Sequence, residues 1–228
     1  IGGKTIIAHK IENALNSREL DDVCVSTDCP DMLAIAGEYP VHAISRPSIL
    51  CEDSGIDHDE QWAHIWAHDV GRYCQMTGDT VGPEDAVVEL QGNSFLFRRD
   101  IINRAISTAR SNPDFVWVRT AYPSGAHHPM YAVEMNDDGS AKFAYLDNDR
   151  FVRSGEATQY HLVDGGVLVH RYPYPSNNST GLYICPVESQ DCVHIHTMKD
   201  YQLCVARWNY LANPLGTTAF NPELIGAN

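Results

Sequence analysis

The sequence predicts an α/β fold in which a mostly parallel sheet carries helices on both faces and is interrupted by an antiparallel insertion. Short apolar runs alternate with stretches whose apolar residues recur at helical spacing, and a parallel connection needs a crossover long enough to be a helix. Later in the chain, two short strands flank an Asn-Asp-Asp-Gly sequence, which is typical of a hairpin. With 228 residues, of which 43% are hydrophobic, the chain is expected to form one domain over residues 1–228.

The first half of the chain repeats the alternation of helix and strand. Apolar side chains at every third or fourth position mark the helices, Pro30 marks the start of one of them, and short apolar runs that end in polar residues mark the strands. These patterns predict, in order, a helix over 6–20, a strand over 22–26, a helix over 30–36, a strand over 41–44, a helix over 54–73 and a strand over 86–90.

The second half departs from this alternation after one more helix and strand. The expected elements are a helix over 100–109, a strand over 115–119, hairpin strands over 131–135 and 141–146, a last strand, and a helix that starts near Asp200. We expect residues 120–171 to form the antiparallel insertion.

The charge of the chain argues against two classes of partner. Its 16 basic and 30 acidic residues give a formal net charge of −14, the opposite of what nucleic acid or an anionic membrane surface attracts. No apolar run is long enough to cross a bilayer. Seven cysteines at scattered positions predict free thiols in a reducing cytoplasm rather than a disulfide framework. The sequence therefore predicts a cytoplasmic protein whose ligands are small molecules, with neither nucleic acid nor membrane as a partner.

Histidine pairs at metal-binding spacing raise the alternative of a zinc site. His64 and His68 lie four residues apart on a predicted helix, and His194 and His196 alternate on a strand, so either pair could share one zinc ion. A zinc site needs further ligands, and the His-Glu-x-x-His pattern is missing. We therefore do not expect zinc catalysis.

Two polar clusters lie where the predicted strands end, at residues 26–28 (STD) and 91–94 (QGNS). Ligands of α/β sheets bind outside the carboxyl ends of the strands. The amides of Gln91 and Asn93 end an apolar strand and need hydrogen-bond partners, which favours a binding role over simple turn formation. The sequence thus predicts a ligand site between these two clusters.

Several segments resemble, in order and spacing, the acylneuraminate cytidylyltransferases, which make CMP-activated sialic and related acids. The opening of that family is matched by residues 3–8 (GKTIIA), 11–14 (IENA), 25–28 (VSTD) and 46–47 (RP). Later segments of the family are matched by residues 88–94 (VELQGNS), 164–171 (DGGVLVHR) and 195–203 (IHTMKDYQL). The similarity spans Gly2 to about Trp208.

The resemblance implies a Rossmann-like nucleotidyltransferase fold and a CTP-dependent transfer of CMP to an acidic acceptor, with release of pyrophosphate. It further implies a 2-keto-3-deoxy sugar acid as acceptor, Mg²⁺ as cofactor and a homodimer that forms through the insertion. The family's glycine-rich phosphate loop would lie before Ile1, and upstream residues are expected. Two alternatives stay open: a phosphonate acceptor of the phosphonoformate type, and a non-catalytic nucleotide-binding relative. The second is motivated by His196 and Asn93, which stand where the family has metal-binding aspartates.

The resemblance also assigns roles to individual residues. The expected nucleotide-binding residues are Lys4, Ser26, Asp28, Arg46, Gln91 and Asn93. The expected catalytic residues are Asp200, His196 and Asn93, with Asp200 as the metal ligand because Mg²⁺ prefers oxygen ligands. The expected acceptor-binding residues are Gln91, Ser94, His128, Arg153 and Asp164.

Structural interpretations compete with these roles. Asp28 and Asp200 could each cap a helix, Asp164 could be a turn residue, and Lys4 and Arg46 could be solvated surface residues. The functional interpretation requires positions 28 and 93 to converge with position 200 around one hollow of triphosphate size.

Overall fold

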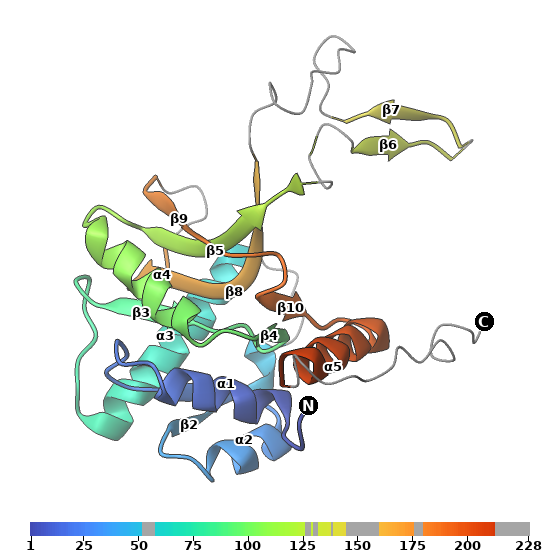
Figure 1. Cartoon of the computed structure of the whole chain (residues 1–228). Helices are drawn as coiled ribbons and strands as arrows, with labels where there is room; N and C mark the ends of the chain where they lie inside the picture. The colour runs from blue at the N-terminus through green and yellow to red at the C-terminus, as the bar shows by residue number, and fades with distance from the viewer. Residues whose placement is uncertain are drawn as a thin grey trace.

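A computed structural model of the chain describes residues 1–51, 58–125, 129, 132–137, 139–144, 160–175 and 180–212. Figure 1 shows its elements in chain order. The helices are α1 (Ile6–Leu15), α2 (Pro30–Ala36), α3 (His58–Thr77), α4 (Asp100–Ser111) and α5 (Met198–Ala212), with a short 3₁₀ helix η1 (Ser48–Leu50). The strands are β1 (Cys24–Thr27), β2 (His42–Ser45), β3 (Ala86–Glu89), β4 (Ser94–Leu96), β5 (Trp117–Pro123), β6 (Val133–Met135), β7 (Ala141–Phe143), β8 (His161–Arg171), β9 (Leu182–Pro186) and β10 (Cys192–His194).

The central sheet has the strand order β3-β8-β5-β9. β8 runs antiparallel to both β3 and β5, whereas β5 and β9 are parallel. A separate parallel pair joins β1 to β2, and an antiparallel pair joins β4 to β10. The predicted α/β fold is confirmed, and the sheet around β8 is mixed rather than mostly parallel.

Helices cover both faces of the central sheet, as the alternation of helix and strand predicts. Val118 and Val169 are register partners on one face and pack with the buried side of α4. Trp117 and His170 are register partners on the opposite face, where Trp66 of α3 meets His170 at 4.9 Å between ring centroids. Successive residues of a strand point to opposite faces of the sheet. The register of β5 with β8 therefore directs one residue pair toward α4 and the next pair toward α3.

The last part of the predicted insertion lies within the central sheet. Residues 161–171 form β8, which pairs on both sides within the central sheet because Val167 and Val169 are fully buried there. What stands apart from the other elements is the β6–β7 hairpin (Figure 1).

Helix ends also shift. The helix predicted over 6–20 ends at Leu15 because Asn16 caps it, and α3 continues to Thr77, beyond the predicted end at 73. The predicted start of α3 at residue 54 lies outside the described residues.

A groove of about 1300 Å³ lies between two half-sheets, which are the β1–β2 pair and the central sheet of β3, β8, β5 and β9. Residues of β1 line one side of it and residues of β3 line the other, with α1 and α3 also contributing. Among the described residues, β1 pairs only with β2 and β3 pairs only with β8, so the facing strand edges are open. None of the helices in the described part of the chain combines the length and apolar character that a bilayer span needs.

Candidate active site

Arg46 is held at the end of the β1–β2 pair by two side chains. Its Nε donates to Ser26 Oγ at 3.1 Å, and its Nη2 donates to Asp69 Oδ2 at 3.1 Å. Asp69 comes from α3, is 7% exposed, and also contacts His68 Nδ1 at 2.9 Å. The structure thus brings the predicted residues Ser26 and Arg46 together in the groove. Sequence reasoning missed Asp69. The feature that could have identified it is a carboxylate on the apolar face of the helix, next to Val70 in the sequence.

Glu89, the last residue of β3, is influenced by the charges of three cationic side chains, Arg119, Arg46 and Lys10. Burial raises the pKa of Glu89 to about 7, although the charges of Arg119, Arg46 and Lys10 act in the opposite direction. Burial lowers the pKa of Lys10 to about 8, against the influence of Cys192 and Glu89. Lys10, Glu89 and Arg46 all line the groove. Sequence reasoning missed Lys10, Glu89 and Arg119, and the available signal was a charge within an otherwise apolar pattern.

The predicted polar cluster after β3 forms a tight turn. The backbone N–H of Ser94 donates to the carbonyl of Gln91 at 3.1 Å, and Ser94 Oγ donates to the same carbonyl at 2.9 Å. Ser94 is fully buried, so its hydroxyl holds the turn and does not face the groove as an acceptor-binding residue would. Gln91 and Asn93 do line the groove.

Asn93 and His196, which the sequence predicts to act together, lie side by side. The distance from Asn93 Nδ2 to His196 Nε2 is 3.4 Å, and the backbone N–H of Ile195 donates to the Asn93 carbonyl at 2.7 Å. The rings of His194 and His196 stack with centroids 6.0 Å apart. Burial lowers the pKa of His194 and so favours its neutral ring.

Asp200 forms a capping box with Thr197 at the start of α5. Asp200 Oδ2 accepts from the backbone N–H of Thr197 at 2.7 Å, from that of His196 at 3.0 Å and from Thr197 Oγ1 at 2.9 Å, and the Asp200 N–H donates to Thr197 Oγ1 at 3.3 Å. These hydrogen bonds, those from Thr197 above all, lower the pKa of the carboxyl. The capping interpretation is therefore correct for Oδ2, while Oδ1 has no hydrogen-bond partner among the described residues.

Asp164 lies within β8, where the register with β5 shifts between Arg119 and Ala121. Its Oδ1 accepts from the Gly166 N–H at 2.9 Å and from the Thr120 hydroxyl. The next residue, Gly165, has a φ of 60°. A Cβ atom at this position would lie 2.5 Å from Gln91 Oε1 and 2.7 Å from His194 Cε1. The bonds of Asp164 point into the protein and stabilise an irregularity within a strand, so Asp164 is not the hairpin-turn residue that the structural interpretation predicts. Gly165 lets Gln91 and His194 pack against the backbone of β8.

The remaining predicted residues lie apart from this arrangement. Lys4 pairs with Glu12 at 2.6 Å, and its side chain is half exposed. Asp28 is exposed and does not cap α2, whose N-cap residue is Cys29 with no side-chain cap hydrogen bond. Neither Lys4 nor Asp28 is among the described residues that line the groove. His128 and Arg153 lie outside the described residues.

The predicted convergence of positions 28, 93 and 200 is thus met only in part. Position 93 lines the groove and is linked to Asp200 through His196, whereas Ser26 and Thr27 line the groove in place of Asp28. Among the described residues, no three His, Cys, Asp or Glu side chains form a cluster that could hold a metal ion.

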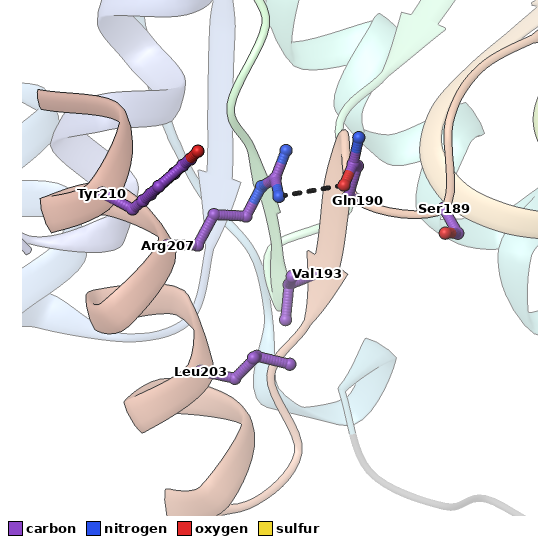
Figure 2. Close-up of a pocket in the computed structure, with 6 residues that line it drawn as sticks. All are labelled: Ser189, Gln190, Val193, Leu203, Arg207 and Tyr210. Carbon is purple, nitrogen blue, oxygen red and sulfur yellow. Dashed lines mark hydrogen bonds between the residues drawn. The ribbon is translucent and has the colours of Figure 1, made fainter. Parts of the chain in front are cut away.

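A second hollow, of about 320 Å³, lies between β10 and α5 (Figure 2). Its lining includes Val193, Leu203 and Tyr210, and Arg207 Nη1 donates to Gln190 Oε1 across it at 3.3 Å. The Arg207 guanidinium also lies 5.1 Å from the centre of the Phe97 ring. None of the residues predicted for the site lines this hollow, so the groove is the better candidate.

Comparison with known proteins identifies the family of the chain. The chain is 25% identical over 206 residues to a Helicobacter pylori protein described as pseudaminic acid cytidylyltransferase and UDP-2,4-diacetamido-2,4,6-trideoxy-beta-L-altropyranose hydrolase. That match covers 86% of this chain and 37% of the relative, so the chain spans well under half of the relative's length. The fold is similar to that of CMP:2-keto-3-deoxy-manno-octonic acid synthetase complexed with CTP, with a TM-score of 0.57, 17% identity, and coverage of 94% of this chain and 90% of that one. The family profile described as Cytidylyltransferase matches residues 1–143, and the chain therefore belongs to the cytidylyltransferase family.

Proposed function

We propose that the protein is a CTP-dependent cytidylyltransferase that joins CMP to an acidic acceptor, a 2-keto-3-deoxy sugar acid, and releases pyrophosphate. The observation that carries this proposal is the groove, where Arg46 held by Ser26 comes from one half-sheet and Gln91 and Asn93 come from the other. Both relatives described above are named for sugar-acid chemistry, which supports a sugar acid over a phosphonate as acceptor.

Cytidylyl transfer is an in-line attack by an acceptor oxygen on the α-phosphorus of CTP, with pyrophosphate as the leaving group. Negative charge is shared among the phosphate oxygens in the transition state, so positioning and positive charge do most of the work. In a protein of net charge −14, these donors have to be concentrated locally. Arg46 supplies a fixed cation, and the amides of Gln91 and Asn93 supply hydrogen bonds that orient the substrate.

We propose that Mg²⁺ is held by two side-chain oxygen atoms of this chain. A protein usually holds Mg²⁺ through one or two carboxylates, with substrate phosphates completing the coordination. Asp200 Oδ1 and the amide oxygen of Asn93 are suitable oxygen ligands, and the ion would neutralise phosphate charge when bound. His196 is a poor magnesium ligand, so we assign it a contact with phosphate or with water.

Pyrophosphate release tests the proposed function. The assay combines CTP with pseudaminic acid, 2-keto-3-deoxy-manno-octonic acid or phosphonoformate, each with and without Mg²⁺. We expect Mg²⁺-dependent release with a sugar acid. Release with phosphonoformate alone would contradict the assigned acceptor, and CTP binding without turnover across the panel would identify a non-catalytic relative.

We also propose a homodimer that forms through the β6–β7 hairpin. Val133, Met135 and Phe143 are 53%, 77% and 40% exposed, and the register places them on one face of the hairpin, while the Glu134–Lys142 ion pair lies on the other. A two-stranded ribbon with an exposed apolar face needs a partner to cover it.

Replacing Val133 and Met135 together with aspartate is therefore expected to convert the dimer to a monomer, because two charges would be buried at the interface. Light scattering coupled to size-exclusion chromatography measures the mass. The control is Glu134→Gln on the opposite face, which should leave the dimer intact. A dimer that survives the double replacement would place the interface elsewhere.

A further inference from the structure

Lys10 is a buried cation with few partners of its own. It comes from α1, is 5% exposed, and donates from Nζ to Ser94 Oγ at 2.8 Å. Ser94 is the single hydrogen-bond acceptor that the described residues place on this ammonium, which has three donor hydrogens. Lys10 also lines the groove beside Gln91 and Asn93. A buried ammonium therefore faces the candidate site with donors that the protein does not use.

The groups that face Lys10 do not neutralise it fully. They are Glu89 on β3, and Cys192 and His194 on β10. Burial raises the pKa of Glu89 to about 7, so this carboxyl is only partly ionised at neutral pH, and burial raises the pKa of Cys192 to about 12, so its thiol is uncharged. No carboxylate among the described residues lies within ion-pair distance of Nζ. Burying a charge without a partner is unfavourable, so an anion bound next to Nζ would lower the free-energy cost of burying this ammonium.

We propose that Lys10 is a substrate-contacting residue, whose ammonium binds an anionic oxygen of the nucleotide phosphates or of the acceptor carboxylate next to the Gln91–Ser94 turn. This inference rests on the proposed function and extends it, because the resemblance assigns no role to position 10. The chemistry is the same for both oxygen sources: a charge-assisted hydrogen bond in a site of low dielectric. The family resemblance places metal-binding aspartates at positions 93 and 196, where this chain has Asn93 and His196. In our proposal, the Lys10 ammonium supplies positive charge next to these positions.

The test compares Lys10→Met, Lys10→Gln and Lys10→Arg with the wild-type chain. Calorimetry measures the dissociation constants of CTP and of inorganic pyrophosphate, and steady-state kinetics measures KM and kcat for the sugar acid. We expect the Met and Gln variants to lose about 10- to 100-fold in affinity for the ligand that Lys10 contacts, and the Arg variant to recover most of it. Weakened CTP and pyrophosphate binding identifies phosphate as the contact, whereas an increase confined to the acceptor KM identifies the carboxylate.

Arg72→Met is the matched control, because it removes one positive charge from an exposed side chain of α3 that bonds only to Gln75 among the described residues. Thermal unfolding separates binding from folding. A purely structural lysine would lower the melting temperature when removed, whereas we expect Lys10→Met to melt at the same temperature or higher, because it removes a buried charge.

The pH dependence gives a second measurement that does not rely on Lys10→Met folding. CTP affinity of the wild type should fall as pH rises above about 8, where the free ammonium loses its proton, and this fall should be absent in Lys10→Arg. If Lys10→Gln binds every ligand as the wild type does, the inference is wrong while the proposed function stands. If the wild type neither binds CTP nor releases pyrophosphate, the proposed function itself is wrong.

Discussion

Replacing Arg46 with methionine is expected to lower the free energy of unfolding by about 3 kcal/mol and to remove most of the affinity for CTP. The destabilisation follows from Asp69, which is buried and accepts from Arg46 Nη2 at 3.1 Å. Without Arg46, this carboxylate would stay in the interior with His68 as its other side-chain contact. The loss of binding follows from the position of Arg46 in the groove, where Ser26 fixes the orientation of its guanidinium.

The double variant Arg46→Met with Asp69→Asn separates these two effects. Asparagine leaves no buried charge without a partner, so most of the lost stability should return, as chemical denaturation can measure. CTP affinity should stay low, because the cation that we propose as a nucleotide contact would still be missing. A double variant that regains both stability and CTP affinity would show that Arg46 serves only to neutralise Asp69.

The order of elements was predictable from the sequence because it depends on local signals. Pro30 begins α2, and the bounds of that helix agree with the prediction at 30–36. Part of each predicted polar cluster lines the groove, residues 26–27 at the end of β1 and residues 91–93 after β3. The place of β8 was not predictable in this way. Its pairing with both β3 and β5 joins segments that are far apart in the chain, and no local pattern in 161–171 distinguishes a central strand from a hairpin.

The charged residues of the candidate site could not be predicted from the sequence for a related reason. Glu89 and Arg119 are both register partners of Leu168, so they lie on the same face of the sheet on either side of β8. In the sequence, each of them is an isolated charge in an apolar strand. Their shared position on either side of Leu168 becomes visible only from the register of three strands. Lys10 joins them from α1, where its sequence signal is a charge at a position of the helix that apolar residues otherwise occupy.

Replacing Asp200 with asparagine is expected to reduce turnover by about 100-fold while CTP binding changes little. An asparagine side-chain oxygen can still accept the N–H groups of His196 and Thr197, so the capping box at the start of α5 should survive. The charge that would attract Mg²⁺ is lost, so the Mg²⁺ concentration needed for half-maximal rate should rise. Turnover, calorimetric CTP binding and a Mg²⁺ titration of the rate measure the three quantities.

The capping role of Asp200 has its own control in Thr197→Ala, which removes the hydroxyl that bonds to Asp200 and leaves the carboxylate in place. This variant should melt at a lower temperature and keep its turnover, whereas Asp200→Asn should show the reverse, and Asp200→Ala should lose both stability and turnover. If Asp200→Asn turns over like the wild type, the carboxylate serves only to cap α5. The metal would then have to be held by the substrate phosphates and by other residues. The reciprocal behaviour of the two variants thus decides between a structural and a catalytic aspartate at a position where one oxygen atom is already used by the helix.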